Sequence, residues 1–177
     1  MNPARRSFIQ TGGGVILAGL AGMASLRVSH AEDVIDIAMM GTPGGAKVWF
    51  RPIGLLIQPG QTVRWTNRDP GNSHTSTAYH PTFFKKMQRI PEGAKPWDSG
   101  FLLPNESYSV TLTVPGVYDY YCLPHEHAGM VGRIIVTAPE PHGWQTHEGN
   151  DQSVPEAARA GFPSIDRIMK EKVVQQL

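Results

Sequence analysis

The single cysteine of the chain, Cys122, is followed closely by three other side chains that can bind metals. The segment Cys-Leu-Pro-His-Glu-His-Ala-Gly-Met places His125, His127 and Met130 downstream of it, and His74 lies upstream. A thiolate and two imidazoles in one plane, with a weak thioether above them, form the ligand set of copper sites that transfer electrons. The spacing Cys-x2-His-x4-Met therefore predicts a mononuclear copper site, with His74 as the imidazole from a second loop.

The first 31 residues have the pattern of an export signal. Arg5 and Arg6 are followed by an apolar, glycine-rich run over residues 12–26 and by Ser29-His30-Ala31, a small-x-small cleavage pattern. The alternative to a cleaved signal is an uncleaved membrane anchor. The run is shorter than the roughly 20 residues of a membrane span, which argues against this alternative. The twin arginine resembles a Tat signal and favours Tat over Sec export. We expect a signal peptide over residues 1–31 and a periplasmic location.

Export makes the lone cysteine unusual, because exported domains normally use cysteines in disulfide pairs. A buried structural thiol is the simpler interpretation, since free cysteine behaves as a small hydrophobic side chain. The imidazoles and the thioether that follow Cys122 favour the metal site instead.

Charge and composition exclude several classes of protein. Removal of residues 1–31 takes away three of the 16 basic residues and none of the 15 acidic ones, which leaves a net charge of about −2. This balance favours neither nucleic acid nor a strongly charged membrane surface as a partner. Glycine (19) and proline (15) make up about 19% of the 177 residues, against an average near 12%. That excess favours short strands joined by turns.

Alternating polar and apolar residues predict an all-β sandwich. Residues 62–67 alternate, and so do residues 108–114, where Tyr108, Val110, Leu112 and Val114 share one face. Pro-Gly pairs at 59–60 and 115–116 mark turns. The strands that we expect cover residues 34–40, 47–50, 53–57, 62–67, 97–103, 108–114, 117–121 and 131–136.

Two segments have a different character from these strands. Residues 79–96 are predicted to be irregular or partly helical, with Lys85, Lys86 and Arg89 as a solvated basic face or a surface that steers an acidic partner. Beyond the domain of residues 32–138, residues 139–177 are predicted to form a linker and a short helical tail. Ser164 is the expected N-cap of a helix. We expect this helix to pack on its own domain, with docking to a partner as the alternative.

Residues 62–136 resemble the plastocyanin and pseudoazurin group of cupredoxins. The resemblance implies a Greek-key β-sandwich that holds one type 1 (blue) copper ion. His74, Cys122 and His125 would be the equatorial ligands and Met130 the axial one. The matching pieces are Pro59-Gly60-Gln61-Thr62-Val63, Trp65-Thr66-Asn67, His74, Asp98-Ser99-Gly100, Pro115-Gly116-Val117-Tyr118-Asp119-Tyr120, the loop from Cys122 to Met130, and Gly132-Arg133-Ile134-Ile135-Val136.

Two positions allow more than one interpretation within this resemblance. His127 competes with His125, but its spacing from Cys122 and Met130 fits neither the plastocyanin nor the azurin pattern, so we prefer His125. Plastocyanins often carry Asn after the first histidine, where it ties the two ligand loops together. Thr75 stands there in this chain, and its hydroxyl is a partial substitute.

The predicted function is that of a monomeric periplasmic electron carrier that meets a cytochrome or an oxidoreductase transiently. Copper storage or delivery is the alternative, although such sites usually use Met-rich or paired-Cys ligands, and Met39-Met40 is the only Met pair here. An enzyme would need further copper centres and normally a second sandwich, for which the chain is too short. We therefore predict no catalytic activity.

Overall fold

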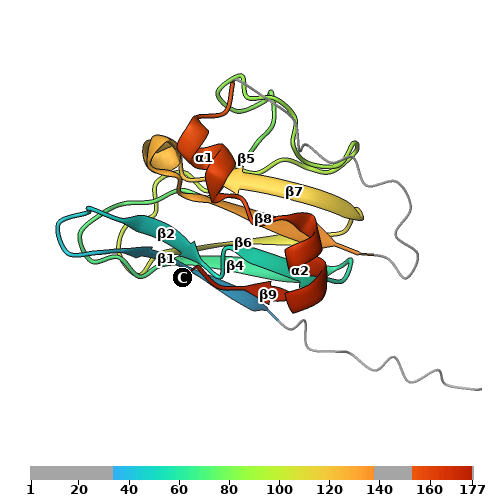
Figure 1. Cartoon of the computed structure of the whole chain (residues 1–177), viewed down its shortest axis with the longest axis horizontal. Coiled ribbons are helices and arrows are strands. Elements are labelled where there is room, and N and C mark those ends of the chain that lie inside the picture. Colours follow the sequence, from blue (N-terminus) through green and yellow to red (C-terminus); the bar gives the residue numbers. More distant parts are fainter. Residues whose placement is uncertain (1–33, 138–152, 177) are drawn as a thin grey trace, which may run out of the picture. The chain divides into compact units, whose positions relative to one another are not determined.

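A computed structural model describes residues 34–137 and 153–176 of the chain. The predicted signal peptide and most of the predicted linker lie outside these residues. The described part consists of two β-sheets, two short α-helices and one 3-10 helix (Figure 1). The prediction of an all-β sandwich with a short C-terminal helical extension is therefore confirmed.

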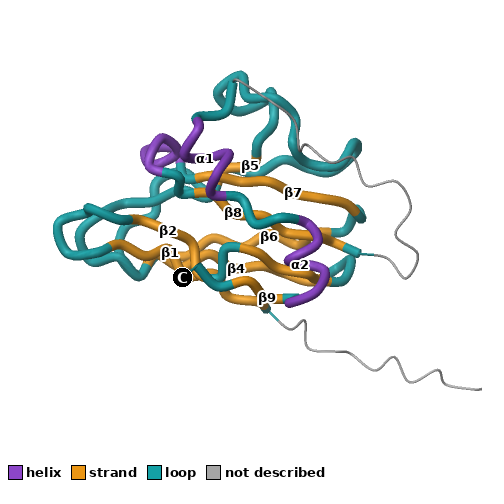
Figure 2. The backbone as a smooth tube through the Cα atoms, viewed as in Figure 1, coloured by secondary structure: helices purple, strands orange, loops and turns teal. Residues whose placement is uncertain are grey.

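The first sheet has the strand order β2-β1-β4-β6. Figure 2 shows the strands of both sheets joined by loops, with the two α-helices beside them. Strands β1 and β4 run parallel, whereas the β1–β2 and β4–β6 pairs are antiparallel. The alternation predicted for residues 108–114 is present in β6, where Leu112 is buried and Tyr108 and Val110 are half-buried. The strands of this sheet are β1 (Ile35–Gly41), β2 (Val48–Arg51), β4 (Gln61–Asn67) and β6 (Ser107–Leu112).

The second sheet has the order β5-β7-β8-β3-β9 and carries the segment that leads to the cysteine. Its central strand β8 pairs with β7 in antiparallel and with β3 in parallel fashion. The last strand, β9, comes from the C-terminal tail and pairs with β3. The strands are β3 (Gly54–Ile57), β5 (Thr77–Ala78), β7 (Gly116–Tyr121), β8 (Val131–Val136) and β9 (Val173–Val174).

Aromatic side chains from both sheets fill the core between them. Tyr120 of β7 contacts the rings of Phe50 and Trp65 edge to face, with centroids 4.8 and 5.3 Å apart. Cys122 and Met130 belong to the same buried cluster. The two sulfur atoms are therefore held by the close-packed core, whose side chains are constrained in position.

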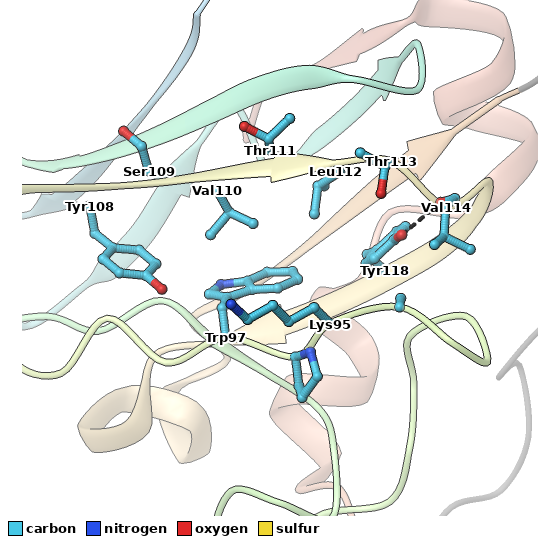
Figure 3. A pocket seen from close by; sticks show the side chains of 12 residues that line it. Lys95, Trp97, Tyr108, Ser109, Val110, Thr111, Leu112, Thr113, Val114 and Tyr118 are labelled. Atoms are coloured by element: carbon cyan, nitrogen blue, oxygen red, sulfur yellow. Dashed lines mark hydrogen bonds between the residues drawn. The ribbon is translucent and has the colours of Figure 1, made fainter.

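The segment before β6 agrees with its predicted structure only in part. Residues 79–96 are turns and irregular chain, within the prediction, whereas residues 97–103, predicted as a strand, form only isolated bridges to His74 and Thr77. A cavity of about 260 Å³ lies between Trp97 and β6. In Figure 3, Tyr108, Val110 and Leu112 point from β6 toward Trp97, whereas Ser109 and Thr111 point away.

The C-terminal tail forms two helices, α1 (Glu156–Gly161) and α2 (Ile165–Glu171). The predicted N-cap is confirmed, because the Ser164 hydroxyl accepts a hydrogen bond from the Arg167 N–H at 3.3 Å. Ile168 is fully buried against Ile53, Ile135 and Val174, so α2 packs on its own domain as expected. Not every apolar residue at helical spacing with Ile168 is buried, since Met169 and Val173 are exposed. Among residues 34–137 and 153–176, no helix combines the length and apolarity needed to cross a bilayer.

Substitution of Ile168 by Ala should destabilise the sandwich itself. The change removes a fully buried side chain that contacts β3, β8 and β9. Such truncations lower the free energy of unfolding by about 2–5 kcal/mol. Urea unfolding of the metal-free protein, followed by tryptophan fluorescence, measures the loss. Met169→Ala, at a side chain that is 37% exposed, is the matched control and should change stability by less than about 0.5 kcal/mol. Equal stability of the two variants would mean that the tail is dispensable for the fold.

Candidate metal centre

Cys122 lies where β7 ends and a 3-10 helix, η1 (Leu123–Ala128), begins. Its side chain is fully buried. The Cys122 N–H donates to the carbonyl of Met130 at 3.0 Å, and the Met130 N–H donates to the carbonyl of His125 at 3.1 Å. These bonds close the loop that carries the three downstream candidate ligands.

His125 and His127 lie on the same turn of η1 but differ in their surroundings. His125 is half-buried, and its Nδ1 lies 3.3 Å from Cys122 Sγ. His127 is exposed. The structure thus brings His125, and not His127, toward the sulfur. Met130 is fully buried in the core beside this loop.

His74 approaches from a second loop, whose shape depends on Asn67 at the end of β4. The buried Asn67 side chain donates to the carbonyls of Asn72 and Leu102 at 2.8 and 2.9 Å, and its oxygen accepts from the Asp69 N–H at 2.8 Å. Backbone bonds between His74 and Leu102 fix the loop further. As a result, His74 is fully buried with Nδ1 3.6 Å from Cys122 Sγ.

Thr75 joins the two ligand loops. Its N–H points at Cys122 Sγ at 3.3 Å, and its hydroxyl oxygen accepts a hydrogen bond from the Leu123 N–H at 2.8 Å. A second contact, with the Thr77 hydroxyl at 3.0 Å, fixes that side chain. The expectation that threonine substitutes for asparagine as the tie between the loops is therefore confirmed.

The spacing of the three donor atoms fits a single metal ion. His74, Cys122 and His125 each offer one ligand atom, and all of these atoms lie within 4.8 Å of one another. Imidazole nitrogen and thiolate sulfur bind a first-row metal at about 2.0 and 2.3 Å. In a trigonal plane those bonds place nitrogen and sulfur about 3.7 Å apart. The two nitrogen–sulfur distances of 3.6 and 3.3 Å match that separation.

Burial controls the protonation of the site without metal. It lowers the pKa of His74, partly opposed by the Asp69 carboxylate, and lowers the pKa of His125, assisted by the neighbouring His74. Both imidazoles are therefore neutral at neutral pH, and histidine must be neutral to bind a metal. Burial also raises the pKa of Cys122 to about 11, although the Thr75 N–H opposes the rise. The thiol keeps its proton at neutral pH.

Two carboxylates beside the candidate ligands were missed in the sequence. Asp69 Oδ2 lies 3.1 Å from His74 Nε2. Glu126, next to His125, is buried and accepts hydrogen bonds from the Tyr79 hydroxyl at 2.8 Å and from Lys86 Nζ at 2.5 Å. Asp69 stands before Pro70 and Gly71 in a turn, and Glu126 stands beside the exposed His127, so neither position signals a contact with the candidate ligand loops in the sequence.

The basic segment is only partly the solvated face that we expected. Lys86 pairs with Glu126, and Arg89 pairs with the buried Asp119 at 2.8 Å. Lys85 is exposed. Two of the three cations thus stabilise buried carboxylates, one of which lies on the candidate ligand loop.

Comparison with known proteins identifies the family of the chain. The model of copper binding proteins of the plastocyanin/azurin family matches residues 37–137. The chain is a cupredoxin of this family. The plastocyanin of Chlamydomonas reinhardtii is 37% identical over 126 residues, which cover 68% of this cupredoxin and 81% of the plastocyanin. The plastocyanin of Prochlorothrix hollandica is 36% identical over 121 residues, 66% of this chain and 84% of that protein.

A solved structure extends the similarity to the fold. A pseudoazurin from Sinorhizobium superposes with a TM-score of 0.55 at 30% identity, covering 72% of this cupredoxin and 89% of the pseudoazurin. The family and the His-Cys-His group together make one type 1 copper ion the cofactor of this cupredoxin.

Metal binding by the metal-free cupredoxin should release about one proton at pH 7.5, because the thiol must ionise while both imidazoles are already neutral. The apparent affinity for Zn²⁺, a probe without redox chemistry, should then rise about tenfold per pH unit between pH 7 and 9. Calorimetric titrations in two buffers of different ionisation enthalpy count the protons. Binding without proton release would mean that the thiolate exists before the metal arrives.

Thr75→Val should loosen the contact between the ligand loops, because valine keeps the side-chain volume but offers no acceptor to the Leu123 N–H. An unpaired buried donor costs about 1–3 kcal/mol of unfolding free energy. Denaturant unfolding of the metal-free cupredoxin measures the loss. Thr113→Val, at an exposed position, is the matched control. The tie is unimportant if both valine variants unfold at the same urea concentration.

Proposed function

We propose that this cupredoxin carries single electrons between redox partners, with His74, Cys122 and His125 as equatorial copper ligands and Met130 as the axial ligand. The observation that carries the proposal is the approach of two buried or half-buried imidazole nitrogens to one buried thiol. Family membership supports the electron-transfer role. Copper, when bound, supplies the one-electron redox couple.

The residues of this chain suit rapid exchange between two oxidation states. Thiolate and thioether sulfur favour the reduced ion, while imidazole accepts either oxidation state. The candidate ligands come from two loops that Thr75 ties together, and two of them, Cys122 and Met130, are part of the core. Such a scaffold resists rearrangement, so little of the geometry changes when the electron arrives or leaves.

The half-buried His125 is the proposed electron exit. Its neighbours on η1 include Leu123, Pro124 and Ala128, of which the last two are exposed. Short apolar surfaces without strong pairing suit transient redox encounters, whose interfaces are among the smallest between proteins. We propose a cytochrome or an oxidoreductase as the partner class, and a monomeric carrier.

Export completes the proposal. The twin-arginine pattern supports removal of residues 1–31 and delivery to the periplasm by the Tat route. Residues 32–138 form the proposed cupredoxin domain and residues 139–177 its linker and tail. The proposed carrier has no catalytic site of its own.

The main alternative is a protein that stores or delivers copper. Such a protein must release its ion readily. Buried ligands on two loops that are tied together would instead slow the release of copper. A colourless copper complex that gives up its ion quickly to a weak chelator would support this alternative and contradict the carrier.

Copper addition to the purified protein should produce an intense blue charge-transfer band and a reversible one-electron wave in voltammetry. Cys122→Ser should abolish the band, because the transition arises on the thiolate. His127→Ala, which alters an exposed histidine two residues from His125, should leave both band and wave unchanged. Loss of the band in His127→Ala together with its survival in His125→Ala would reverse the ligand assignment.

A further inference from the structure

A buried carboxylate stands behind His74, on the side of the ring away from the sulfur. Asp69 Oδ2 lies 3.1 Å from His74 Nε2, while His74 Nδ1 is the nitrogen 3.6 Å from Cys122 Sγ. The Asp69 side chain is 2% exposed and the His74 side chain 0%. This pair is thus shielded from solvent on the loop that carries a proposed ligand.

The Asp69 carboxylate is held in one position by several contacts. Its Oδ1 accepts from the Gly71 N–H at 2.8 Å, and its Oδ2 accepts from Asn72 Nδ2 at 2.8 Å. Gly41, the last residue of β1, lies next to this carboxylate. A Cβ atom added to Gly41 would stand 1.8 Å from Asp69 Oδ2. The absence of a side chain at position 41 therefore makes the room that the carboxylate occupies.

The contact determines which nitrogen of His74 carries the proton. An ionised carboxylate can only accept hydrogen bonds, so His74 Nε2 must be the protonated nitrogen. The lone pair is then on Nδ1, the atom that lies near the sulfur. A second-sphere carboxylate of this kind also raises the basicity of the ligating imidazole.

We propose that Asp69 is a positioning residue of the copper site, which fixes the tautomer of His74 and lowers the reduction potential. The inference rests on the proposed role of His74 as a ligand. A fixed negative charge behind the imidazole stabilises Cu(II) more than Cu(I), because the attraction grows with the charge of the ion. Burial leaves this attraction weakly screened by salt. The carboxylate therefore favours the oxidised state.

A purely structural role for Asp69 is the competing explanation, since the carboxylate also accepts hydrogen bonds from Gly71 and Asn72. In that role, removal of the carboxylate would lower the stability of the protein and would lower the affinities for Cu(II) and Cu(I) by the same factor. The two explanations predict different effects of an Asp69 substitution on the reduction potential and on the tautomer of His74.

Asp69→Asn removes the charge and keeps the size of the side chain. The affinity for Cu(II) should fall 10- to 100-fold, as for other second-sphere partners, and the affinity for Cu(I) should fall less. A tenfold difference between the two losses raises the one-electron potential by about 59 mV. Competition titrations with chelators and voltammetry measure these quantities. Nitrogen-15 NMR of the metal-free protein should show protonated Nε2 at His74 in the wild type and a changed tautomer population in Asp69→Asn.

Gly41→Ala tests the same inference without removing the charge. The added methyl group must displace the Asp69 carboxylate, while the backbone at position 41 stays in a conformation open to alanine. The potential should rise as in Asp69→Asn. Asp36→Asn is the matched control, because Asp36 forms an exposed ion pair with Arg64, and its potential should equal that of the wild type.

The outcomes separate this inference from the proposed function. Failure of the wild type to form a blue copper complex would overturn the ligand assignment. A blue wild type whose potential and His74 tautomer are unchanged in both Asp69→Asn and Gly41→Ala would overturn only the role of Asp69. Loss of stability alone, without a change in potential, would assign Asp69 to the architecture of the loop.

Discussion

Two proposed ligands separated by 48 positions in the chain, His74 and Cys122, must meet within one bond length of a common ion. The pairing of β5 with β7 achieves this, because Thr77 lies opposite Tyr121. The residue directly before the cysteine is thereby placed beside a residue three positions after the histidine. A slip of one residue would turn the side chains of β5 to the other face. A strand of two residues thus sets the geometry of the site, and Thr75 secures it with its hydroxyl group.

Local patterns in the sequence were sufficient for much of this architecture. The spacing around Cys122 pointed to His125 and Met130, and alternation identified the longer strands, because both signals depend on residues close together in the chain. The short strands β5 and β9 escaped prediction, since two residues carry no usable periodicity. Residues 97–103 have strand-like composition but pair only at single bridges. Glu126 acquires its role from Tyr79 and Lys86 on a distant segment, which no local pattern reveals. Asp69 and His74 lie five residues apart, but the loop that brings them together depends on the long-range bond from Asn67 to Leu102.

The tail and the segment of residues 79–96 both contact the loop of His125. Glu126 is fastened by Tyr79 and Lys86. Helix α1 packs against η1 so closely that a Cβ on Gly129 would stand 3.0 Å from the Ala157 carbonyl oxygen. Arg133, paired with Asp119, also donates to the Pro163 carbonyl at 3.0 Å. The ligand loop is therefore packed between elements that are far apart in the sequence, which limits its freedom to rearrange.

The space at Gly41 has a consequence for the evolution of this chain. A glycine at the end of a strand usually attracts attention as a flexible point, yet here the neighbouring carboxylate, not the backbone, requires it. A side chain at position 41 would clash with the Asp69 carboxylate in its present place, so glycine at 41 and aspartate at 69 are compatible with each other. The two positions, 28 residues apart, should therefore change together in an alignment of descendants, with glycine and aspartate gained or lost as a pair.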